Sequence, residues 1–165
     1  MKKLLAGLAC AALPLVAAAP AQAAPGAAGP TVTYSSVGPA TAPEYHVEYV
    51  ITVRGGVATA KVGGYGTVDG TAKPARTETK RLDHAAQRAL VQTAPSIPAP
   101  ATGTPCPGAS TSRLTYEMGR AAPRKTVAYS CAAGDRGDAA AISRYMAPVE
   151  RLFTVLPSVT FTVTR

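Results

Sequence analysis

A strictly alternating segment, Glu44–Val53, constrains the fold of this chain more than any other feature. The alternating apolar positions are Tyr45, Val47, Tyr49, Ile51 and Val53, and the positions between them are His46, Glu48, Val50 and Thr52. A period of two is typical of a strand that buries one face, so we expect the first set in the core and the second toward solvent. Gly55-Gly56 follows, and glycines accept the positive φ angles of a tight turn. The sequence therefore predicts a β-hairpin that returns through Val57–Val68.

Five further segments have the composition or the alternation of strands. Thr31–Val37 is rich in β-branched and aromatic residues, and we place it at an edge of the sheet. Ala75–Arg81 is polar and alternating and extends the hairpin, while Arg113–Met118 and Arg124–Cys131 pair as a second hairpin. Ser158–Arg165 alternates as a final strand. We assign the apolar face of the second hairpin to Leu114, Tyr116, Met118, Val127 and Tyr129.

Two segments have the spacing of one-sided helices. Asp83 is a good N-cap for a helix that runs to about Thr93, and Asp138 is the N-cap of a second helix. Apolar residues keep helical spacing as far as Leu156, although Pro148 lies inside this segment and should kink it. Consecutive hairpins with two one-sided helices predict an α+β fold, in which an antiparallel sheet of four to six strands carries two helices packed on one face.

The N-terminus has the three parts of a secretory signal peptide. Lys2 and Lys3 precede an uncharged stretch, Leu4–Ala19, and Ala21-Gln22-Ala23 supplies the small residues that a signal peptidase accepts. The apolar stretch is too short to span a bilayer, so we predict a secreted protein without a transmembrane segment. The expected organisation is a signal peptide at 1–23, a flexible lead-in with the edge strand at 24–43, and a single α+β domain at 44–165.

The cysteines then become informative about compartment and stability. Cys10 lies in the predicted signal, so only Cys106 and Cys131 remain in an oxidising compartment, and we expect them to form a disulfide bond. In the chain-entropy model, such a bridge stabilises the folded state by about 3 to 4 kcal/mol. This is a large share of the total stability of a small domain.

The sequence does not display the residue groups of a common enzyme. His46 and His84 are the two histidines, they lie far apart in the chain, and we expect both to be solvated surface residues. No serine lies in a Gly-x-Ser-x-Gly turn, and the paired cysteines leave no thiol nucleophile. We therefore predict a non-enzymatic protein with no catalytic residue, no metal site and no cofactor.

The chain is basic, with 17 Lys and Arg against 9 Asp and Glu. Its densest cationic stretch contains Lys73, Arg76, Lys80 and Arg81, which form either a solvated face or a contact for anionic polymers of the cell wall. Exported proteins seldom meet nucleic acid, so we expect no nucleic-acid partner.

Several segments together resemble the emfourin-type inhibitors of thermolysin-like metalloproteases, which are small α+β proteins. The residues that carry the resemblance are the strand and turn Tyr49–Val57, the helix Leu82–Leu90, the strand Leu114–Met118, the return strand Lys125–Val127, and a closing helix with Pro148 and Leu152. The resemblance covers about residues 45–156 and is closest at Arg54, Gly55 and Gly56. It implies that an extracellular protein, most specifically a protease, is the partner and that these three residues are candidate contacts.

Three classes of function stay open at this point. The first is a protease inhibitor that blocks the cleft of its target with an exposed loop, either the Gly55-Gly56 turn or the Pro-rich Ser96–Ser110 segment. The second is a cell-envelope domain whose basic surface binds anionic wall polymers. The third is a hydrolase, which would require His46 or His84 to lie beside a carboxylate and a serine in a cleft.

Overall fold

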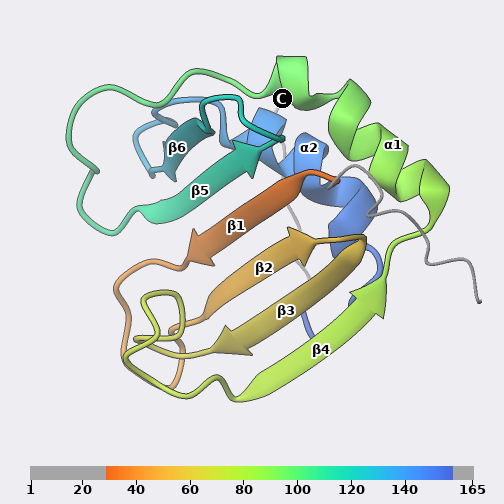
Figure 1. The fold of residues 1–165 in the computed structure, drawn as a ribbon. Coiled ribbons are helices and arrows are strands. Elements are labelled where there is room, and N and C mark those ends of the chain that lie inside the picture. Colours follow the sequence, from red (N-terminus) through yellow and green to blue (C-terminus); the bar gives the residue numbers. More distant parts are fainter. Residues whose placement is uncertain (1–28, 158–165) are drawn as a thin grey trace, which may run out of the picture.

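In a computed structural model that describes residues 29–157, the chain forms a six-stranded antiparallel sheet with two helices on one of its faces (Figure 1). The strands are β1 (Thr31–Val37), β2 (Glu48–Arg54), β3 (Val57–Gly63), β4 (Arg76–Arg81), β5 (Ser110–Glu117) and β6 (Arg124–Ser130). The helices are α1 (His84–Gln92), the short 3-10 turn η1 (Ala94–Ser96) and α2 (Ala139–Glu150). The strand order across the sheet is β4-β3-β2-β1-β5-β6, and the predicted α+β class is confirmed.

Strand β1 lies in the middle of the sheet. Val32 pairs with Val53 of β2 on one side and with Tyr116 of β5 on the other, and all three side chains are buried. The predicted position of Thr31–Val37 at an edge is therefore wrong. Because β1 joins the two hairpins, it belongs to the folded domain, which starts earlier than residue 44.

Both helices begin where the sequence predicts. The Asp83 carboxylate accepts a hydrogen bond of 2.7 Å from the Ala86 amide, and the Asp138 carboxylate accepts one of 2.6 Å from the Ala141 amide. Such caps satisfy amide groups that have no partner within the helix. Helix α2 contains Pro148 and ends at Glu150, before the predicted limit at Leu156.

The hydrophobic core lies between the helices and one face of the sheet, which we call the covered face. Ile51, Leu90, Leu114, Ile142, Met146 and Val149 are among its largest fully buried side chains. The Tyr145 hydroxyl donates a hydrogen bond of 3.1 Å to the Leu90 carbonyl and so links α2 to α1. The buried hydrophobic residues of the described chain form one cluster here, so apolar burial stabilises the fold mainly at this face.

The start of the first hairpin differs from the expected alternation. Strand β2 begins at Glu48, so Tyr45 and Val47 precede it and are 75% and 39% exposed. His46 and Glu48, expected toward solvent, are buried instead. Residues 45–47 precede the strand and so are not bound by its period, whereas Glu48 lies on the predicted face but is buried by contacts with His46 and the Val68 amide.

The second hairpin also differs from its predicted apolar face. The register pairs Leu114 with Thr126, so Thr126 and Ala128 share the covered face with Leu114 and are buried. Val127 and Tyr129, which alternate with them along β6, belong to the opposite face and are half-buried. Met118 lies beyond the end of β5 and is 44% exposed.

Two predicted segments, the signal peptide at residues 1–23 and the strand Ser158–Arg165, lie outside the described residues. None of the helices within residues 29–157 has the length and apolar character needed to cross a membrane.

Candidate functional site

The segment from Ile97 to Ala109, which we call the anchored loop, is largely exposed to solvent and is attached at several points to the rest of the domain. It connects η1 to β5 and contains no helix or strand. Its exposed residues are Ala99, Pro100, Thr102, Gly103, Thr104, Pro105, Pro107 and Gly108. Its four prolines are Pro98, Pro100, Pro105 and Pro107, and each restricts its own φ angle. A loop of this length is expected either to be disordered or to serve a function.

Strand β6 holds the first half of the anchored loop. The Thr126 hydroxyl donates a hydrogen bond of 3.2 Å to the Ala99 carbonyl. Two residues further along, the Ala101 amide donates one of 2.7 Å to the Val127 carbonyl. The loop therefore runs beside the outer edge of the sheet and occupies part of an edge that would otherwise be free to pair.

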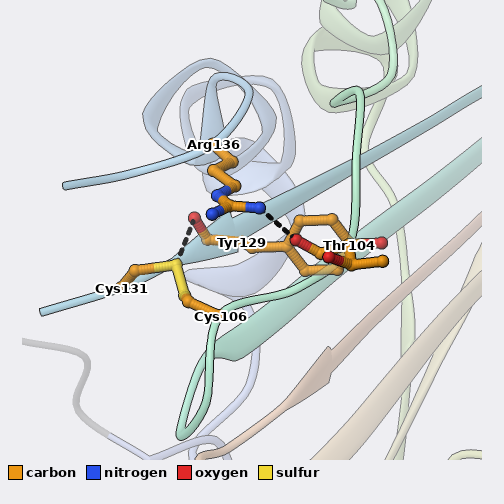
Figure 2. Close-up of a disulfide and its surroundings, with 5 residues drawn as sticks. All are labelled: Thr104, Cys106, Tyr129, Cys131 and Arg136. Carbon is orange, nitrogen blue, oxygen red and sulfur yellow. Dashed lines mark hydrogen bonds between the residues drawn. A yellow bond between two sulfur atoms is a disulfide. The ribbon is translucent and has the colours of Figure 1, made fainter. Parts of the chain in front are cut away.

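A disulfide bond and an arginine hold the second half (Figure 2). Cys106 is bonded to Cys131, with the two Cα atoms 6.2 Å apart, which confirms the predicted bridge. Arg136 exchanges two backbone hydrogen bonds of 2.8 Å with Tyr129, and its guanidinium donates to the Thr104 carbonyl. The loop is thus attached to both segments that flank Cys131.

The exposed end of the anchored loop is a tight turn. The Ala109 amide donates a hydrogen bond of 3.1 Å to the Cys106 carbonyl, and Pro107 and Gly108 occupy the two central positions. Gly108 has a φ angle of 70°, and proline followed by a glycine with positive φ is the signature of a type II turn. The disulfide bond therefore fixes the first residue of a turn whose central residues are exposed.

The other candidate contact, the turn Arg54-Gly55-Gly56, lies at the opposite end of the strands. Gly55 and Gly56 have φ angles of 57° and 75°, as in a two-residue hairpin turn with both central residues at positive φ. The Gly56 carbonyl accepts a hydrogen bond of 2.8 Å from the Leu82 amide, which attaches the turn to the chain just before α1. Arg54 and Gly55 are exposed, and the structure does not bring them near the anchored loop.

Sequence reasoning missed a polar cluster in which the buried side chains of His46 and Glu48 lie beside the exposed ring of Tyr65. The His46 ring stacks on Tyr65 with 3.5 Å between ring centroids. Its Nδ1 lies 2.9 Å from the Pro39 carbonyl oxygen, and its Nε2 lies 3.0 Å from Glu48 Oε1. Each ring nitrogen therefore lies within hydrogen-bond distance of an oxygen atom, and these two contacts hold the ring between the chain before β2 and β2 itself. His46 is therefore not the solvated residue that was predicted, whereas His84 is exposed as predicted.

A pocket of about 220 Å³ opens at one end of the covered face. Hydroxyl groups are its common feature, and they belong to Tyr34, Tyr49, Ser36, Ser110, Ser112 and Ser130. The Tyr49 hydroxyl lies 3.3 Å from that of Tyr34 and donates a hydrogen bond of 3.2 Å to Glu150. Burial raises the pKa of the Glu150 carboxyl, and the bond from Tyr49 opposes part of this rise. Burial likewise raises the pKa of both tyrosines.

None of the described residues form a group of three or more His, Cys, Asp or Glu side chains that could hold a metal ion. Comparisons of the chain with models of protein families, with curated proteins and with solved structures find no match.

Proposed function

We propose that this chain is an exported, non-enzymatic binding protein that inhibits an extracellular protease by inserting the anchored loop into the protease cleft. The observation that supports the proposal is a segment whose backbone is both exposed and held at four points. These points are the Ala99, Ala101 and Thr104 backbone groups and the Cys106 sulfur.

A held loop suits inhibition for an energetic reason. Ordering a flexible segment on binding costs about 0.5–1.5 kcal/mol for each immobilised side chain, and a loop that is already ordered avoids most of this cost. Attachment also opposes turnover, because the disulfide bond and the hydrogen bonds would keep the cut ends together after cleavage near Cys106. The disulfide bond is compatible with an oxidising compartment, the environment to which the predicted signal peptide would direct the chain.

The turn at Arg54-Gly55-Gly56 supports inhibition less well than the anchored loop does. It has only two central residues, and one of them packs against the chain before α1. Its exposed surface is therefore small compared with that of the anchored loop. The resemblance to emfourin-type inhibitors stays a prediction, and it makes a thermolysin-like enzyme one of the first targets to test.

The direct experiment is a titration of thermolysin and of subtilisin with the purified protein, following residual activity on a small peptide substrate. We expect stoichiometric loss of activity with one protease and an uncleaved inhibitor at the end of the titration. Unchanged activity of both enzymes, with the protein intact, would count against these two protease classes. Rapid cleavage of the loop would identify it as a substrate instead of an inhibitor.

A pair of matched variants tests which surface makes the contact. Thr104→Arg adds a long cationic side chain at an exposed position of the anchored loop, and Ala85→Arg adds the same side chain at an exposed position of α1. If the loop enters the cleft, Thr104→Arg weakens inhibition and Ala85→Arg does not. Arg54→Ala reports on the alternative contact at the β2–β3 turn.

A further inference from the structure

The face of the sheet opposite the helices, which we call the open face, carries a continuous row of hydroxyl groups. The pairings Thr59 with Thr79, Thr52 with Thr59, Thr33 with Thr52 and Thr33 with Thr115 place one threonine on each of five neighbouring strands. Thr115 pairs in turn with Lys125, which ends the row on β6. We call these five threonines the threonine row. Figure 1 shows the sheet with its helices behind, so the open face is the one toward the viewer.

The side chains of the threonine row face solvent, and the hydroxyls of Thr59 and Thr79 form a hydrogen bond of 3.2 Å with each other. Thr33, Thr52 and Thr79 are exposed, and Thr59 and Thr115 are half-buried. Among residues 29–157, no helix packs on this face. Since neighbouring strands lie about 4.8 Å apart, the threonine row extends over about 19 Å from β4 to β5. A site of this length on an open surface does not resemble the concave pocket that encloses a small molecule.

Cations lie on both sides of the threonine row. Successive residues on one face of a strand are two positions apart, so each of four cations neighbours a threonine of the row. These are Arg54 beside Thr52, Lys61 beside Thr59, Arg81 beside Thr79, and Arg113 beside Thr115. With Lys125, they give the face five exposed positive charges. None of the five forms an ion pair with any carboxylate of the described residues.

Negative charge is nearly absent from the same face. Glu48 is buried at one end, where it accepts hydrogen bonds from His46 and from the Val68 amide. Glu117 is the exposed carboxylate that strand alternation places on this face. The open face therefore combines hydroxyl groups, which both donate and accept hydrogen bonds, with unpaired cations.

We propose that the open face binds an extended acidic polysaccharide, whose hydroxyl groups contact the threonine row and whose carboxylates contact the flanking cations. The unpaired cations favour a negatively charged ligand, and the length of the row favours a polymer over a small molecule. Single-stranded nucleic acid fits less well because its binding uses exposed aromatic rings as stacking platforms. On this face of β6, Tyr129 is half-buried and lies four positions from Lys125. This surface is separate from the anchored loop, so the inference does not depend on protease inhibition.

The test uses the purified protein and a fluorescein-labelled oligogalacturonate, followed by anisotropy at low and at physiological ionic strength. We expect saturable binding that weakens as salt increases, and no binding to an uncharged oligosaccharide of the same length. Lys61→Gln with Arg113→Gln removes two charges from the open face. Hydrogen bonds to charged groups are stronger than those between neutral groups, so the loss of two cationic donors should weaken binding about tenfold or more.

A matched control distinguishes binding at the open face from general attraction of the polyanion to a basic protein. Arg88→Gln with Arg151→Gln removes the same number of charges from exposed positions on α1 and next to α2, and it should change the affinity by no more than about twofold. Thr33→Val with Thr52→Val keeps the shape of the row, removes two hydroxyl groups, and should also weaken binding. Equal weakening by the two charge variants, absence of binding at low salt, or tighter binding of single-stranded DNA would each overturn the proposal.

Discussion

The covered and the open faces of the sheet belong to the same strands but carry opposite chemistry. On β2, Ile51 and Val53 are 0% and 2% exposed against the helices, while Thr52 between them is exposed to solvent. The covered face holds the domain together through apolar burial, whereas the open face contributes little to that burial. This difference shows that stability and the proposed polysaccharide binding depend on different side chains. Substitutions can therefore change one property without the other.

The largest expected effect is on the covered face. Ile51→Ala removes a fully buried side chain and should lower the free energy of unfolding by about 2–5 kcal/mol, because a cavity remains where the side chain was. Val50→Ala, on the open face of the same strand, is the control and should cost about 1 kcal/mol. Urea denaturation followed by circular dichroism measures both values. Similar losses for the two variants would contradict the division between faces.

The second prediction concerns an exception at one end of the open face. His46→Ala removes the partner of the buried Glu48 Oε1 and leaves the Val68 amide on Oε2, so it should lower the free energy of unfolding by about 3 kcal/mol. The control, His84→Ala, removes an exposed histidine and should change it by less than about 0.5 kcal/mol. The same denaturation experiment compares them. If His46→Ala is as mild as its control, the cluster does not stabilise the fold.

The third prediction concerns the buried carboxyl on the covered side. Because burial raises the pKa of Glu150, the folded state binds the proton of this group more tightly than the unfolded state does. Its contribution therefore favours folding below the usual carboxyl pKa and is lost as the pH rises through the raised value. Glu150→Gln keeps an acceptor for the Tyr49 hydroxyl and should be more stable than the parent at about pH 7, with a smaller difference near pH 4.

Unfolding of the parent and of Glu150→Gln, measured by thermal denaturation across this pH range, checks the sign. Glu117→Gln is the control, since this carboxylate is exposed on the open face. A stability difference between Glu150→Gln and the parent that grows as the pH falls would show that the carboxylate form is the favoured one.

The smallest expected effect is on the threonine row. Thr52→Val replaces an exposed hydroxyl with a methyl group of similar shape and equal suitability for a strand, so the free energy of unfolding should change by less than about 0.5 kcal/mol. Urea denaturation provides this value, and polysaccharide binding by the same protein provides the second measurement. Unchanged stability together with weakened binding would sharpen the contrast between the two faces.

Local signals in the sequence predicted much of the fold. Asp83 and Asp138 cap the two helices, and Gly55-Gly56 forms the hairpin turn, because capping and turn geometry depend on residues only a few positions apart. The Cys106–Cys131 bond also followed from the sequence, since these are the two cysteines that follow the predicted signal peptide. The α+β class could be derived from these elements without knowledge of their order in the sheet.

The candidate sites depended on neighbours that are distant in the sequence. The basic run near residue 80 does not form one patch, because alternate side chains of β4 point to opposite faces, and Lys80 pairs with Glu78 at 2.7 Å. Arg81 instead joins cations from four other strands beside the threonine row. No window of the sequence contains that row, since its members meet only through strand pairing.

Composition and short-range patterning thus determined which segments of this chain become strands and helices and where most of them turn, because those outcomes follow from the preferences of adjacent residues. Tertiary structure alone decided that β1 lies at the centre of the sheet, that His46 is buried against Tyr65, and that five threonines align on one face. The physical reason is that strand order and register minimise the free energy of the whole sheet, including pairings between residues far apart in the chain.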